Sequence, residues 1–155
     1  MPNKLRFALG ADHAGFALKE KVRQYLLGRG YEVDDQGPST PDPVDYPDFA
    51  EKVATRVAAR QADFGVVICG TGLGVAMAAN KVPGIRAATV NDTLSAYFAR
   101  AHNDANVLAL GGRLADEVTA HKILETWIAT PFEGGRHQRR IEKIARIDQK
   151  HHPEK

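Results

Sequence analysis

Short apolar runs alternate with segments of helical spacing along most of the chain. The runs that predict strands cover residues 7–10, 31–34, 66–69, 85–90 and 107–110. Between them apolar residues recur every three or four positions, as at Leu18, Val22 and Leu26, which predicts amphipathic helices. Strands that are apolar throughout are buried on both faces, and their alternation with helices indicates a parallel sheet. We therefore expect an α/β fold, a Rossmann-like three-layer α/β/α sandwich around a five-stranded parallel sheet.

The C-terminal part of the sequence predicts two further helices. One lies around residues 118–128 and is stopped by Pro131, because proline cannot continue a helix. The glycines at 134 and 135 then break the chain before a last helix with Ile141 and Ile144 on one face and basic residues on the other. At 155 residues the chain suits one hydrophobic core. We expect a single domain over residues 1–150 and a disordered tail at 151–155.

Composition narrows the class of protein. Hydrophobic residues make up 43% and charged residues 26% of the chain, which is typical of a soluble globular protein. The apolar run near the N-terminus is too short to span a membrane or direct export, so no membrane partner is expected. Cys69 is the only cysteine and cannot form an internal disulfide. We therefore expect a cytoplasmic protein.

Charge is concentrated near the C-terminus. The formal net charge is +2, yet residues 136–150 alone carry six basic and two acidic side chains. Such a local excess favours an anion site over a general nucleic-acid surface. No aromatic residues are interleaved with these arginines, so base stacking is not indicated and no nucleic-acid partner is expected.

Polar residues follow the first two predicted strands. Ligands of an open parallel sheet bind at the carboxyl ends of its strands, so such positions are informative. Asp12 and His13 follow the first strand; they either contact a ligand, or Asp12 caps the next helix and His13 lies on the surface. Residues 37–43, with one glycine and three prolines, form a turn-rich loop that follows the second strand and would form the rim of a site.

The third predicted strand ends at Cys69. The loop that follows consists of Gly70, Thr71, Gly72, Leu73 and Gly74. Its glycines let backbone N–H groups turn toward an anion in front of a helix N-terminus. A dinucleotide-binding loop would need glycine or alanine where Val75 stands, and no P-loop lysine follows, so the spacing disfavours a nucleotide cofactor. Cys69 is either inert packing or a base activated by the helix N-terminus.

Further candidates lie in the second half of the chain. His102 follows a predicted helix and is either a helix cap or an acid catalyst, and the adjacent Asn103 can donate to an oxyanion. Arg113 follows the fifth strand. Arg136 and Arg140, four residues apart, share one helix face and can reach one phosphate, unless they belong to a solvated basic face. We expect these groups to meet at one edge of the sheet.

Five motifs, in order, resemble the B-type ribose 5-phosphate isomerase family, which includes the galactose 6-phosphate isomerase subunits. They are Asp12-His13 with Gly15, Ile68-Cys69-Gly70-Thr71-Gly72, Ala79-Asn80-Lys81, His102-Asn103-Asp104 and Glu133-Gly134-Gly135-Arg136-His137-Gln138. The resemblance covers nearly the whole chain. It implies a Rossmann-like fold and a dimer or tetramer with the active site between subunits.

The resemblance also implies roles for single residues. Cys69 would move the proton between two sugar carbons, and His102, with Thr71 nearby, would assist ring opening. The residues that would contact the sugar and its oxyanion are Asp12, His13, Gly70 to Gly74 and Asn103. Those that would bind substrate, mainly its phosphate, are Arg113, Arg136 and Arg140.

The reaction implied is the interconversion of ribose 5-phosphate and ribulose 5-phosphate, with neither a metal nor a cofactor. One alternative is a hexose 6-phosphate, such as allose or galactose 6-phosphate, whose length would be sensed around residues 37–48 and 97–100. Another, of a different class, is a nucleotide-binding α/β module without catalysis.

Overall fold

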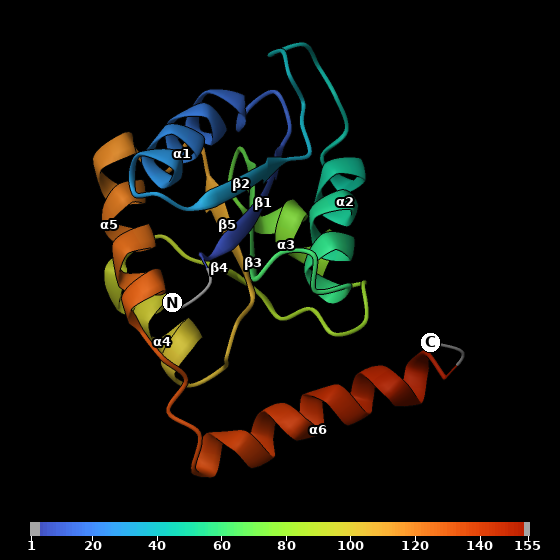
Figure 1. Ribbon diagram of the computed structural model, residues 1–155. Coiled ribbons are helices and arrows are strands. Elements are labelled where there is room, and N and C mark those ends of the chain that lie inside the picture. Colours follow the sequence, from blue (N-terminus) through green and yellow to red (C-terminus); the bar gives the residue numbers. More distant parts are fainter. Residues whose placement is uncertain (1–3, 154–155) are drawn as a thin grey trace.

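The computed structural model describes residues 4–153 and contains one parallel sheet of five strands in the order β2-β1-β3-β5-β4 (Figure 1). In chain order the elements are β1 (Arg6–Ala11), α1 (Phe16–Gly28), β2 (Glu32–Asp35), α2 (Tyr46–Ala58), β3 (Phe64–Cys69), α3 (Leu73–Ala79), β4 (Ala87–Thr89), α4 (Thr93–Ala101), β5 (Val107–Gly111), α5 (Glu117–Ala129) and α6 (Arg136–His151).

Helices cover both faces of the sheet. Helices α1, α4 and α5 pack on one face, and α2 and α3 pack on the other (Figure 1). Alternate residues of a strand point to opposite faces, so Val66 and Ile68 of β3 join the first layer while Val67 and Cys69 join the second. The predicted three-layer sandwich with a five-stranded parallel sheet is confirmed.

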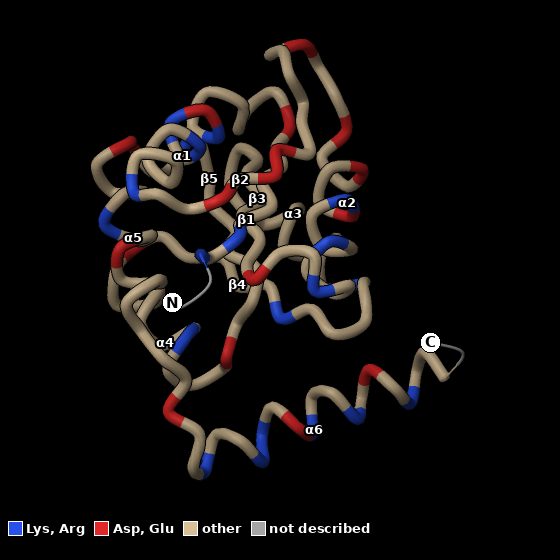
Figure 2. Tube along the Cα trace, in the orientation of Figure 1, with Lys and Arg blue, Asp and Glu red and all other residues tan. Residues whose placement is uncertain are grey.

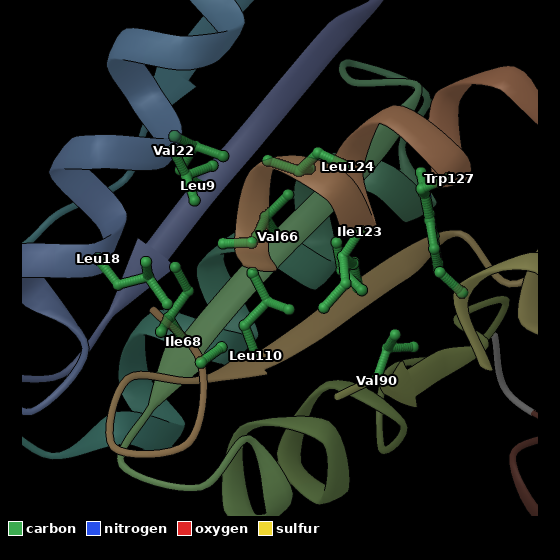
Figure 3. Packing of buried hydrophobic residues seen from close by; sticks show 14 of the residues in the cluster. Leu9, Leu18, Val22, Val66, Ile68, Val90, Leu110, Ile123, Leu124 and Trp127 are labelled. Carbon is green, nitrogen blue, oxygen red and sulfur yellow. The ribbon is translucent and has the colours of Figure 1, made fainter. Parts of the chain in front are cut away.

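The larger apolar layer contains the only tryptophan of the chain. Trp127 of α5 is 1% exposed and lies with Ile123 and Leu124 against the sheet (Figure 3). Its ring meets Phe64 edge-on at a centroid distance of 5.9 Å. The guanidinium of Arg100, from α4, lies 5.8 Å from the ring centroid of Trp127. These contacts tie α4 and α5 to the start of β3.

In the second apolar layer, two glycines let α2 approach the strands closely. A Cβ atom at Gly10 of β1 would lie 2.8 Å from a methyl carbon of Val53, and one at Gly65 of β3 would lie 2.6 Å from its other methyl carbon. Val53 is fully buried against both strands. The close packing sets how near α2 lies to β1 and β3.

Helix α6 extends away from the sandwich and carries the basic C-terminal charge (Figures 1 and 2). Ile141 is 9% exposed, whereas Ile144 and Ile147 are 45% and 61% exposed. Toward the helix end, the carboxylate of Asp148 accepts the backbone N–H of Gly84 at 2.7 Å. The predicted apolar face of this helix is therefore mostly uncovered within one chain.

Two boundaries differ from the sequence prediction. The fourth strand is only Ala87–Thr89, because Arg86 turns its backbone N–H to the Asn106 side chain at 2.8 Å and not to a neighbouring strand. Helix α6 continues to His151, inside the tail predicted to be disordered; residues 154–155 of that tail lie outside the described residues. No helix within residues 4–153 has the length and apolar character to cross a membrane.

Candidate active site

The carboxyl ends of β1 and β3 form the topological switch point of the sheet. From β1 the chain moves outward to β2 and then returns to place β3 on the other side of β1. Connections leave these two neighbouring strands in opposite directions, which opens a crevice where ligands bind in such sheets. Asp12 and Gly70 are the residues that follow the two strands, as the sequence predicts.

Cys69 is the last residue of β3 and is 5% exposed. Its Sγ accepts the backbone N–H of Gly72 at 3.2 Å. Gly72 adopts a φ of 80°, a left-handed conformation that glycine reaches without a Cβ clash. The turn thus aims an N–H group at the sulfur, where it would stabilise a thiolate.

The rest of the glycine loop is fixed from three sides. Thr71 Oγ1 accepts the backbone N–H of Leu73 at 3.2 Å, and Leu73 itself is exposed. A Cβ atom at Gly74 would lie 2.5 Å from the ring of Tyr46, so this aromatic side chain packs directly over the loop. Arg113 donates its backbone N–H to Gly70 O at 2.9 Å. The atoms of its guanidinium lie 3.0–3.3 Å from where a Gly70 Cβ would stand.

Asp12 and His13 have local partners at the same edge. Asp12 is 7% exposed, and its Oδ1 accepts the backbone N–H of Gly15 at 2.9 Å. Gly15 is the N-cap of α1, without a side-chain cap, so Asp12 holds the turn before the helix and does not cap the helix itself. The exposed His13 accepts the backbone N–H of Val44 at its Nδ1, 3.3 Å away. That bond joins the loop of residues 36–45 to the start of α1 and brings it to the rim of the crevice.

His102 and Asn103 lie at the opposite edge of the sheet. They follow α4, which starts beyond β4 and returns the chain to the amino ends of the strands before β5 begins. Arg86, just before β4, donates from Nε to the Asn103 carbonyl at 3.2 Å. Gly65, near the start of β3, donates its N–H to the Asn106 carbonyl at 3.0 Å.

Arg136 and Arg140 lie on the same side of the molecule as His102. Both are exposed on α6, and Glu133, just before that helix, donates its backbone N–H to Ala101 O at 3.0 Å. Figure 1 shows α6 at the end of the molecule opposite to the loop of residues 36–45. The four-residue spacing on one helix is confirmed, and the two arginines share a face.

The expectation that all these groups meet at one edge within a chain is wrong. Cys69 lies four positions after Gly65 along β3, which is about 13 Å at 3.3 Å per residue, and His102 lies beyond the Gly65 end. The physical reason is that a crossover helix returns the chain to the amino edge, so residues after a helix and residues after a strand lie at opposite edges. The candidate site is thus split into a cysteine edge and a histidine edge.

The residues of the two edges are now defined. The cysteine edge comprises Asp12, His13, Cys69, Gly70, Thr71, Gly72, Leu73, Gly74 and Arg113, and the histidine edge comprises His102, Asn103, Arg136 and Arg140.

Three side chains that sequence reasoning missed lie beside these groups. Tyr46 packs over Gly74 at the cysteine edge. At the histidine edge, the imidazole rings of His102 and His137 stack with centroids 4.1 Å apart and planes 13° apart. Glu133 Oε1 lies 3.5 Å from His102 Nε2. The signal for the last two was the motif at residues 133–138, from which only Arg136 was taken.

The cluster of His102, Glu133 and His137 is the one group among residues 4–153 whose ligand atoms are close enough for a metal ion, all within 4.8 Å of one another. The stacked rings are nearly parallel, so their nitrogen lone pairs lie in two separate planes and do not converge on one ion at about 2.0–2.1 Å. At least one ring would have to rotate to bind a metal. Whether the chain works without a metal stays a prediction.

Comparison with known proteins decides the family. Residues 7–144 match the family described as Ribose/Galactose Isomerase. The chain belongs to this family. Within the family, it is 45% identical over 145 residues to ribose-5-phosphate isomerase B of Escherichia coli K12, covering 94% of this chain and 97% of that protein.

Solved structures of family members have the same fold. Ribose-5-phosphate isomerase B of Clostridium thermocellum superposes with a TM-score of 0.94 at 48% identity, covering 95% of this chain and 99% of that one. The enzyme from Mycoplasma genitalium, whose structure holds ribulose 5-phosphate, gives a TM-score of 0.90 at 44% identity, covering 94% and 97%. The resemblance drawn from the five motifs is confirmed.

Proposed function

We propose that this chain interconverts ribose 5-phosphate and ribulose 5-phosphate, and that each active site is assembled from two copies of the chain. The observation that carries the proposal is Cys69 at the switch point, facing a backbone N–H from Gly72 at 3.2 Å. Membership of the ribose/galactose isomerase family supports the reaction class. The ribulose 5-phosphate bound to the Mycoplasma genitalium relative supports the five-carbon substrate.

The chemistry starts with opening of the sugar ring. His102 gives a proton to the ring oxygen as the bond between that oxygen and the anomeric carbon breaks, and the anomeric hydroxyl loses its own proton to solvent, which leaves an aldehyde. The Cys69 thiolate then removes the proton from the carbon next to the carbonyl, forming an enediolate. Returning that proton to the former aldehyde carbon, with a hydroxyl proton moving between the two oxygens, gives the ketose.

Backbone and arginine side chains hold the charges that this reaction creates. N–H groups of the loop from Gly70 to Gly74 and the amide of Asn103 bind the enediolate oxygens. Arg113, Arg136 and Arg140 bind the phosphate, whose binding energy positions the reacting carbons. Asp12 and His13 contact the sugar hydroxyls.

A two-fold dimer would unite the two edges. In a two-fold interface every contact occurs twice, so the cysteine edge of each subunit would face the histidine edge of its partner and form two equivalent sites. Uncovered apolar side chains support such an interface. They are Leu73 and Met77 of α3, Leu94, Tyr97 and Phe98 of α4, and Ile144 and Ile147 of α6, all at least 40% exposed.

Turnover of sugar phosphates tests the reaction. Ribose 5-phosphate, allose 6-phosphate and galactose 6-phosphate are each supplied to the purified protein and ketose formation is followed. We expect ribose 5-phosphate to react best. Preference for a hexose phosphate would keep the mechanism and replace the substrate, and no turnover of any of them would contradict the proposal. A cytoplasmic location stays a prediction of the same proposal.

The role of Cys69 is tested by Cys69→Ala, which should abolish turnover. Val67→Ala is the matched control, because Val67 lies two residues earlier on β3 and faces the same apolar layer. It removes packing from that layer without removing the thiol. Normal turnover by the Cys69 variant would show that the sulfur is not the base.

A further inference from the structure

His137 is a buried residue on an otherwise exposed stretch of helix. It lies in the first turn of α6 and is 6% exposed, while Arg136 and Gln138 on either side are exposed. Its ring stacks on that of His102, whose side chain keeps 30% of its surface exposed. The buried ring of His137 thus supports the partly exposed ring of His102. The proposed reaction assigns His137 no role.

The groups that face His102 come from each neighbouring segment. Phe98, one turn earlier on α4, has its ring centroid 4.8 Å from that of His102. Glu133, before α6, approaches Nε2 at 3.5 Å. From α6, His137 covers one face of the ring, and Arg136 adds positive charge nearby. These contacts come from three parts of the chain and restrict the two side-chain torsions of His102.

We propose that His137 is a positioning residue that, by stacking on the imidazole of His102 and acting together with Phe98, holds the ring in one orientation and leaves its exposed edge to the substrate. The inference rests on the proposed function, because that function gives His102 the proton transfer at the sugar ring. It concerns orientation only, and His137 itself does not contact the reacting atoms.

A histidine at position 137 fits a positioning role better than it fits a role in packing alone. Among the described residues His137 Nε2 is buried and has no hydrogen-bond partner, so an aliphatic side chain would fill the space without leaving a polar atom unpaired. Burial, followed by the nearby His102 and Arg136, lowers the pKa of His137 below its ordinary value. A neutral ring can stack on His102 without repelling it when His102 carries its proton.

Two substitutions separate stacking from other roles. His137→Ala removes the ring, and His137→Phe restores a flat ring without nitrogen. We expect His137→Ala to lower kcat by about 10- to 100-fold, as misplacement of a reacting group does, with a much smaller change in KM for ribose 5-phosphate. His137→Phe should recover most of the lost kcat.

The matched control is His121→Ala. His121 of α5 also stacks on an aromatic ring, that of Tyr25 at 4.5 Å and 22°, and its Nε2 is also buried without a hydrogen-bond partner among residues 4–153. It lies outside both edges of the site, so its loss should reduce stability but leave kcat unchanged. Equal loss of kcat in the His121 and His137 variants would reduce the effect to general destabilisation and overturn the proposal.

Kinetics can overturn the proposal in two further ways. Wild-type kcat in His137→Ala would show that stacking is dispensable. A rise in KM shared by the Ala and Phe variants would make the imidazole nitrogen of His137 a substrate-binding group instead of a positioning one.

A measurement without substrate keeps this inference separate from the proposed function. In isotope-labelled protein the Cε1–Hε1 resonance of His102 should shift when His137→Ala removes the ring current of the stacked imidazole, and should not shift in His121→Ala. An unshifted resonance overturns the stacking. If wild-type protein fails to turn over ribose 5-phosphate while the resonance shifts as expected, the proposed function fails and the stacked pair stands.

Discussion

Mixing two inactive variants tests the assembly of each site from two chains. Cys69→Ala damages only the cysteine edge, and His102→Ala damages only the histidine edge. Within one chain the two edges are separated by the length of β3 from Gly65 to Cys69, about 13 Å. Each variant alone forms dimers in which both sites lack a group. In a mixed dimer, one site combines the two damaged edges and the other combines the two intact ones.

The expected activity follows from counting these sites. Random pairing of equal amounts gives about half mixed dimers, each with one intact site of two. The mixture should therefore reach about one quarter of wild-type kcat per chain. If each site were built within one chain, no pairing could restore an intact site and the mixture would stay inactive.

Co-expression with two different affinity tags provides the assay. Tandem purification isolates the mixed dimer, whose kcat per chain should be about half that of wild type, with an unchanged KM because its intact site is complete. A matched dimer of two differently tagged Cys69→Ala chains controls for contamination by host enzyme. Mixed dimers as inactive as this control would refute the assignment of the two edges to different chains.

Four further results are expected. Gly72→Ala should lower the free energy of unfolding by about 1–3 kcal/mol in urea denaturation, since φ is 80° and a Cβ would meet backbone at 2.9 Å; Gly30→Ala, with φ of 85° and nothing within 4 Å, should cost less. Arg136→Ala should raise KM by about 10- to 100-fold through loss of a charge-assisted hydrogen bond. An equal rise of KM in Arg139→Ala would show that the effect comes from the overall positive charge of α6 and not from a specific contact of Arg136. EDTA should leave turnover unchanged, and inhibition reversed by a divalent ion would contradict the metal-free reaction. The pKa of His137 is lowered in the folded state from 6.5, so the unfolded state binds more protons below that pH and Tm should fall on acidification. His137→Phe should make Tm fall less steeply with decreasing pH. An unchanged dependence of Tm on pH in this variant would contradict the prediction.

The layers of the fold could be predicted from the sequence because a strand that is buried on both faces is a continuous run of apolar residues. In β3 the consecutive residues Val66, Val67 and Ile68 are apolar and at most 1% exposed, so this segment cannot be mistaken for a surface segment. The short β4 was overestimated because Ile85 is buried outside the sheet, in the turn that precedes it. Burial and strand pairing are separate properties, and only burial is visible in a run of apolar residues.

The positions of the candidate residues on strands and helices were predicted, but their arrangement in space was not, and their roles in the reaction stay predictions. Cys69 and the glycine loop were placed correctly at the end of β3 because a strand end and its following turn are contiguous in sequence. His102 was placed at the wrong edge because the direction of α4 matters as much as its existence. The pairing of His102 with His137 joins positions 35 residues apart across two helices, and no local pattern records such a contact.

The single buried tryptophan gives the protein an internal optical probe of known location. Trp127 lies in the layer formed by α1, α4 and α5, whereas Cys69 faces the layer formed by α2 and α3, on the other side of the sheet. The fluorescence of Trp127 will therefore report unfolding of the layer that contains α4. It should respond little to a thiol reagent at Cys69. Emission and chemical labelling can then be recorded on the same sample, as independent signals from the two faces of one sheet.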